Sequence, residues 1–171
     1  MSVLFTIGYE GSNVDDFVKT LLANGIKRLA DVRALALSRK RGFSKKSLAD
    51  RLFANGIEYF HLVQLGNPKP GREAARSGDY HRFHAIYRLH LDSKACEASL
   101  EELAKLAKEL PTCLLCFERE PQCCHRSMVA GAMKASYDFA VVDLCVGHSE
   151  QPKDDAPRKS SHHSREGASA A

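Results

Sequence analysis

The stretch Thr-Cys-Leu-Leu-Cys-Phe at residues 112–117 decides the fold, because it is a short and almost unbroken apolar run. Such a run without alternation is typical of a strand inside a parallel sheet, where helices cover both faces. Pro111 comes directly before it and ends a segment, residues 93–110, in which leucines recur at helical spacing. The sequence therefore predicts a helix that leads into a central buried strand.

The same alternation of strands and helices continues on both sides of this strand. Short apolar runs predict strands over residues 3–7, 28–33, 57–61 and 139–144, and apolar residues at helical spacing predict helices over residues 14–24, 44–55, 80–91 and 124–136. Prolines and glycines without apolar periodicity predict a long loop over residues 66–78. We therefore expect an α/β protein, a single Rossmann-like three-layer domain with a mostly parallel sheet of about five strands.

The composition fits one globular domain. The chain has 171 residues, of which 44% are hydrophobic and 27% charged, which excludes collagen, coiled coils and wholesale disorder. The α/β domain is expected over residues 1–149, and residues 150–171, which are poor in large apolar groups, are expected to form a disordered polar tail. No apolar run approaches the roughly 18 residues of a membrane span, and the first residues do not resemble a secretory signal, so a cytoplasmic protein without membrane contact is expected.

Basic residues are concentrated in the first half of the chain. Residues 1–90 contain 15 Lys and Arg against 8 Asp and Glu, and seven of these basic residues lie between Arg33 and Arg51. A patch of this kind favours a phosphate-bearing small molecule or a nucleic acid as the partner. The alternative is a basic surface that only contacts solvent.

Residues 116–126 combine cysteine, histidine and arginine at the predicted start of a helix. The free backbone N–H groups of a helix start bind anions and lower the pKa of a thiol, and Arg126 reinforces both effects. The segment therefore predicts a phosphate or carboxylate site that includes Cys124, His125 and Arg126. A purely structural loop is the alternative.

Zinc is a competing interpretation of the same segment. Cys113 and Cys116 form a C-x-x-C pair, and Cys123, Cys124 and His125 follow closely. Residues three apart on an extended strand point to opposite faces, whereas a zinc knuckle needs them on a tight turn. We therefore expect no structural zinc and no cofactor, and the six cysteines are expected to be free thiols in a reducing compartment.

Reactive side chains follow several of the predicted strands, where ligands of parallel sheets bind. The candidate catalytic residues are Glu10, Glu118, His61 and Cys124. Two carboxylates that face one substrate suit glycosidic-bond chemistry, and a histidine suits proton transfer near neutral pH. The alternatives are that Glu118 only pairs with Arg33 or Arg126, and that His61 is a hydrogen-bonding element.

The candidate anion- and substrate-binding residues lie at strand ends or helix starts. They are Tyr9, Arg33, Ser38, Arg39, Ser44, Lys45, His125 and Arg126. An arginine that leaves a strand is suited to a bidentate grip on phosphate, and Ser44 is a candidate helix cap. We expect Arg33 and Arg126 to converge on one anion.

Ordered motifs along the chain resemble the bacterial and archaeal family catalogued as domain of unknown function 488. The motifs are Thr6-Ile7-Gly8-Tyr9-Glu10-Gly11, Asp31-Val32-Arg33 with Ser38-Arg39, Gly42-Phe43-Ser44-Lys45 with Leu48, Gly56-Ile57-Glu58-Tyr59 with His61 and Leu65-Gly66, and Cys116-Phe117-Glu118 with Cys124-His125-Arg126. The resemblance covers residues 3–148 and implies an α/β fold with a polar pocket, but no reaction. The chain departs from the family pattern at Ala36, where proline is usual, and at Asn67, where glycine is usual.

Three functions are compatible with these residues. The first is an enzyme that acts on a phosphate-bearing substrate, with a nucleotide or nucleic acid and base or glycosidic-bond chemistry as the best interpretation. The second is a non-catalytic module that binds nucleotides or nucleic acid. The third is a thiol-dependent enzyme that uses Cys124 or Cys116.

Overall fold

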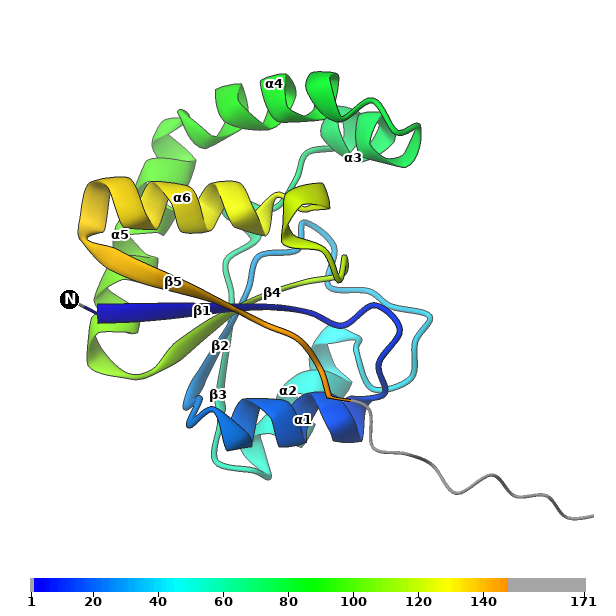
Figure 1. Cartoon of the computed structure of the whole chain (residues 1–171), viewed down its shortest axis with the longest axis vertical. Coiled ribbons are helices and arrows are strands. Elements are labelled where there is room, and N and C mark those ends of the chain that lie inside the picture. The colour runs from blue at the N-terminus through cyan, green and yellow to red at the C-terminus, as the bar shows by residue number, and fades with distance from the viewer. Residues whose placement is uncertain (1, 148–171) are drawn as a thin grey trace, which may run out of the picture.

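Five parallel strands and helices on both of their faces make up residues 2–147, the part of the chain that this computed structural model describes (Figure 1). The elements are β1 (Ser2–Gly8), α1 (Val14–Ala23), β2 (Arg28–Asp31), α2 (Lys45–Phe53), β3 (Glu58–His61), α3 (Lys69–Arg76), α4 (Tyr80–Leu91), α5 (Lys94–Glu109), β4 (Thr112–Cys116), α6 (Arg126–Tyr137) and β5 (Phe139–Leu144), with 3₁₀ turns at Val63–Leu65 and Pro121–Cys123. The expected domain boundary at residue 149 and the tail at residues 150–171 lie outside the described residues.

The strand predicted from residues 112–117 lies in the middle of the sheet. The strand order is β3-β2-β4-β1-β5, and every residue of β4 is buried. Thr112 pairs with Leu4 of β1 on one side and with Arg28 of β2 on the other. The predicted α/β three-layer architecture is therefore confirmed, and the sheet is parallel throughout.

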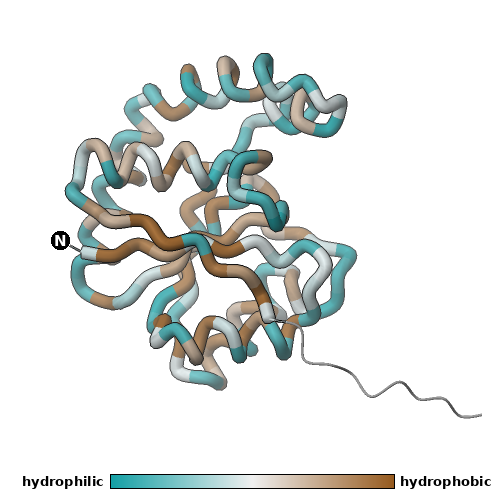
Figure 2. Tube along the Cα trace, viewed as in Figure 1, coloured by the Kyte–Doolittle hydropathy of each residue, from teal (hydrophilic) through white to brown (hydrophobic). Residues whose placement is uncertain are grey.

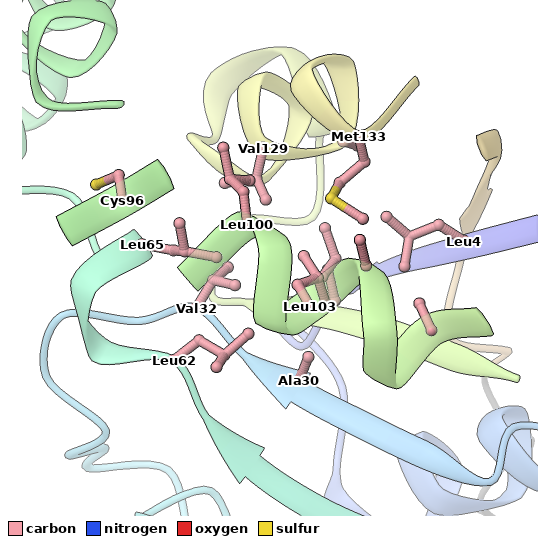
Figure 3. Packing of buried hydrophobic residues seen from close by; sticks show 14 of the residues in the cluster. Leu4, Ala30, Val32, Leu62, Leu65, Cys96, Leu100, Leu103, Val129 and Met133 are labelled. Carbon is pink, nitrogen blue, oxygen red and sulfur yellow. The ribbon is translucent and has the colours of Figure 1, made fainter. Parts of the chain in front are cut away.

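Each face of the sheet has its own hydrophobic core. Helices α1 and α2 cover one face, while α4, α5 and α6 lie on the other, where Leu4, Ala30 and Leu103 pack together (Figure 3). Adjacent residues of β4 alternate between the cores, since Leu114 belongs to one and Leu115 to the other. Figure 2 accordingly shows long hydrophobic stretches along β1 and β5.

The loop predicted over residues 66–78 is wrong, because it contains helix α3. Pro68 is the N-terminal cap of this helix and Pro70 lies in its first turn, where a missing N–H group costs no intrahelical hydrogen bond. The prolines therefore start a helix here and do not interrupt one. Helix α3 packs against α4 (Figure 1).

The loops that follow neighbouring strands leave the sheet in opposite directions. The loops after β1 and β2 lead to α1 and α2 on one face, whereas the loop after β4 leads to α6 on the other (Figure 1). A crevice opens at the carboxyl edge of a sheet wherever adjacent connections part in this way. The end of β4 therefore lies between two such divergence points.

Within residues 2–147, no helix combines the length and the hydrophobicity that crossing a membrane requires.

Candidate active site

A cavity of about 650 Å³ lies at the carboxyl edge of the sheet, and we call it the edge cavity. Its walls come from the segments after β1, β2 and β4, from α3 and from the start of α4. Of the residues predicted for the site, seven line it, namely Tyr9, Glu10, Arg33, Ser38, Arg39, Glu118 and His125. The placement expected from strand ends therefore brings these seven together.

The edge cavity has more cationic than anionic side chains on its walls. Arg39, Arg72 and Arg76 line it together with Arg33, against two carboxylates, Glu10 and Glu118. Nη1 of Arg72 donates a hydrogen bond to the carbonyl of Asn67 at 2.8 Å. Within residues 2–147 the guanidinium groups of Arg39 and Arg76 have no ion-pair or hydrogen-bond partner. They are therefore positioned to meet an anion.

Arg33 is held by the protein itself. Its Nε and Nη2 donate to the two carboxylate oxygens of Asp31 at 2.8 and 2.6 Å, and its Nη1 donates to the Tyr9 hydroxyl and the Phe43 carbonyl at 3.1 and 2.9 Å. Burial by itself would lower the pKa of Arg33, but the bonds and charge of Asp31 outweigh it, so the pKa is raised and the group stays charged. The ring of Tyr9 stacks on Phe43 with centroids 4.2 Å apart. Arg33 thus stabilises the cavity wall by hydrogen bonds within the protein.

Arg126 is fully buried and does not line the edge cavity. Its Nη1 donates to the carbonyl of Glu118, its Nη2 to the carbonyl of Arg119 at 2.8 Å, and its Nε to Oγ1 of Thr6 at 3.2 Å. The guanidinium therefore shapes the loop after β4 from inside. The backbone carbonyl of Glu118 accepts this hydrogen bond, whereas the alternative given by the sequence is a pair between the two side chains.

The loops that carry Glu10 and Glu118 touch each other directly. Oε2 of Glu10 accepts a hydrogen bond from the backbone N–H of Arg119 at 2.9 Å. A Cβ at Gly8 would lie 1.8 Å from the carbonyl oxygen of Glu118, so only glycine allows this approach. The two segments that carry these carboxylates therefore have a fixed relative position.

Three buried side chains with sulfur or nitrogen ligand atoms meet where β4 ends and α6 begins. Sγ of Cys116 lies 3.6 Å and Sγ of Cys124 lies 3.9 Å from Nδ1 of His125. We call Cys116, Cys124 and His125 the thiol–imidazole trio. Cys113 packs in the opposite core, as strand alternation predicts. The trio therefore does not include the C-x-x-C partner considered from the sequence.

Cys124 is a poor candidate nucleophile. It is 1% exposed and does not line the edge cavity. Burial, followed by its contact with Cys116, raises the pKa of its thiol well above the usual value. The lowering expected from a helix start is therefore wrong here, because α6 begins two residues later and burial dominates.

The remaining predicted residues stabilise loops. His61 is half-buried, and its Nε2 lies 2.8 Å from the carbonyl of Arg33. Oγ of Ser44 bonds the backbone of Ser38 and not the start of α2, so the predicted side-chain cap does not form. Lys45 is exposed, and its backbone N–H donates to the carbonyl of Ala36. His61, Ser44 and Lys45 do not line the edge cavity.

Sequence reasoning missed the contribution of α3 and α4. Arg72 and Arg76 fall in the loop predicted over residues 66–78, although their i, i+4 spacing places them on one helix face, with Gly71 and Ala74 buried on the other. Tyr80, 42% exposed at the start of α4, also lines the edge cavity. The i, i+4 spacing was the available signal, and the flanking prolines obscured it.

A search of the curated proteins finds no match to this chain, and a search of the solved structures finds none either. A family model does match, over residues 13–133. The match spans α1 to most of α6 and leaves out β1, Glu10 and β5. The chain thus belongs to the family described as Domain of unknown function DUF488.

Proposed function

We propose that the protein is an enzyme that acts on a phosphate-bearing substrate of nucleotide size, bound in the edge cavity. The observation that carries the proposal lies in one cavity at the ends of β1, β2 and β4. There, two arginines without a partner among residues 2–147 lie together with two carboxylates. Arg39 and Arg76 bind the phosphate, and Glu118 transfers a proton at the reacting bond. Base or glycosidic-bond chemistry fits this set of groups.

The dimensions of the cavity and its aromatic side chains support a nucleotide as the substrate class. A volume of 650 Å³ falls within the roughly 300–1,000 Å³ typical of small-molecule sites. Phe117 and Tyr80 line the cavity and are 44% and 42% exposed, so two partly exposed aromatic side chains are available for stacking with a base. A thiol-dependent reaction that uses Cys124 has less support, because Cys124 is buried outside the cavity.

Phosphate recognition is tested by titration calorimetry with AMP. Arg39→Ala and Arg76→Ala are each expected to weaken AMP binding about tenfold or more, since a charged hydrogen bond contributes about 1.5–3 kcal/mol. Arg41→Ala is the matched control, because Arg41 is an exposed arginine of the same loop that does not line the cavity. Adenosine is expected to bind much more weakly than AMP. Equal AMP affinity in the wild-type protein and an Arg39→Ala/Arg76→Ala variant would contradict the proposal.

Catalysis is tested by turnover of a panel of nucleosides and nucleotides, with products separated by chromatography. Glu118→Gln is expected to lower kcat at least about 100-fold while AMP affinity is kept, because positioned acid–base groups contribute about 10²–10⁴ in rate. Glu120→Gln, an exposed neighbour outside the cavity, is the control. AMP binding without turnover of any panel member would favour the non-catalytic binding module.

A further inference from the structure

We propose that the thiol–imidazole trio binds a zinc ion at the inner wall of the edge cavity. Cys116 ends β4, and Cys124 and His125 lie between the 3₁₀ turn Pro121–Cys123 and α6. Their ligand atoms all lie within 4.8 Å of one another, and the three residues are 1–5% exposed. Two sulfurs and one imidazole nitrogen are a donor set that zinc prefers.

The distances from the imidazole nitrogen to the two sulfurs are close to those of a zinc tetrahedron. Zinc bonds of about 2.3 Å to sulfur and about 2.0–2.1 Å to nitrogen place two ligand atoms about 3.5–3.8 Å apart. The observed distances from Nδ1 of His125 are 3.6 Å to Sγ of Cys116 and 3.9 Å to Sγ of Cys124. These two distances therefore need to change by only a few tenths of an ångström for the side chains to bind the ion.

The imidazole is held in the tautomer that a metal needs. Nε2 of His125 lies 2.7 Å from the carbonyl of Val32. A carbonyl only accepts hydrogen bonds, so Nε2 carries the hydrogen and the lone pair of Nδ1 faces the two sulfurs. The edge of Tyr87 packs against the ring at a centroid distance of 5.1 Å and fixes its orientation. A backbone carbonyl behind a ligating histidine is the usual support of a zinc site.

A backbone N–H group also contacts the sulfur of Cys124. The backbone N–H of Arg126 points to this Sγ at 3.5 Å. A hydrogen bond of this kind stabilises the negative charge that a thiolate keeps when it binds a metal. Two thiolates neutralise one Zn²⁺, so the filled site carries no net charge into the buried region.

A fourth coordination position faces the edge cavity. Cys116 and His125 line the cavity from inside, and Oε2 of Glu118 lies 3.2 Å from Sγ of Cys116 on that side. Three protein ligands with one open position are typical of catalytic zinc sites, whereas structural sites are closed by four. Water or a phosphate oxygen of the substrate fits the open position, next to Glu118.

The zinc content of the purified chain tests this inference. Protein from cells grown with added zinc is expected to contain about one zinc per chain by elemental analysis. The variants Cys116→Ser and Cys124→Ser are each expected to contain less than about 0.1 zinc per chain, because loss of even a supporting residue weakens binding about 10–100-fold. Cys123→Ser is the matched control, because Cys123 is a neighbouring cysteine outside the trio. This variant is expected to keep its zinc.

A cobalt titration of the wild-type chain keeps the test independent of how the variants fold. Co²⁺ added after chelator treatment is expected to give thiolate-to-cobalt absorption in the near ultraviolet and strong visible bands of tetrahedral cobalt, and Zn²⁺ is expected to abolish both. Absence of zinc together with absence of these bands would overturn the inference. Zinc that persists in both trio variants would overturn it as well, and so would iron or copper in the purified chain in place of zinc. Zinc content and AMP affinity are separate readouts, so either proposal can fail while the other stands.

Discussion

Arg126→Ala is expected to lower the free energy of unfolding by about 3–5 kcal/mol, because each hydrogen bond from a charged donor contributes about 1.5–3 kcal/mol. The fully buried guanidinium joins the carbonyls of Glu118 and Arg119 to Thr6 of β1, and alanine removes the donor of all three hydrogen bonds and leaves a void at a fully buried position. Urea unfolding measures the loss, which corresponds to a fall of about 10 °C in Tm.

The affinity of the same variant for AMP separates the two roles considered for Arg126. The folded fraction is expected to bind AMP as the wild-type protein does, because Arg126 does not line the edge cavity. Arg126→Lys keeps the charge but loses the planar fork, so it is expected to recover only a small part of the stability. A tenfold loss of AMP affinity with unchanged stability would contradict the structural role and restore the anion grip expected from the sequence.

Asp31→Ala is expected to cost about 3–5 kcal/mol of stability, because it leaves the guanidinium of Arg33 charged and unpaired in the protein interior. Asp31 is 0% exposed and accepts hydrogen bonds from Arg33 Nε and Nη2 and from the hydroxyl of Tyr59 at 2.6 Å. Burial, followed by the charge of Asp31, raises the pKa of Tyr59, so its hydroxyl stays protonated and donates. Chemical denaturation of the purified variant measures the loss.

The double variant Asp31→Leu/Arg33→Met shows whether the unpaired charge of Arg33 causes the loss of stability in Asp31→Ala. A buried ion pair replaced by apolar side chains of similar volume is often neutral, whereas removal of one partner is strongly destabilising. The double variant is therefore expected to be more stable than Asp31→Ala alone and to recover at least about half of the loss. A double variant no more stable than the single one would mean that hydrogen bonds to Tyr9, Phe43 and Tyr59, and not the unpaired charge, carry the energy.

The sequence predicted the elements whose apolar pattern is local. Helix α4 and strand β5 have the predicted bounds, and β4 is the central strand that its apolar run indicates. Helix α3 was missed because most of its side chains are polar and prolines flank its start, so little local apolar pattern separates it from a loop. Its packing partner is α4, the next helix of the chain.

The site was predictable in position but not in the partners of its arginines. Strand ends correctly placed Glu10, Glu118 and Arg39 at one cavity, because parallel strands share a carboxyl edge. The partners of Arg126 are mostly backbone carbonyls, which any residue type supplies and no motif marks. Asp31 lies two positions before Arg33, and this spacing favours a common face of an extended chain, so the sequence itself indicates this ion pair.

The order of the strands also determines when the sheet can assemble. Strand β1 precedes the other strands of residues 2–147, yet its neighbours are β4 and β5. Leu4 pairs with Thr112 and Val141, more than a hundred residues later. During synthesis the ribosome therefore releases β1 long before either partner exists. The growing chain holds an apolar strand with two unpaired edges, which invites association with chaperones or with other nascent chains. Refolding must likewise close a loop of this length before the edge cavity forms, which is expected to make folding slow.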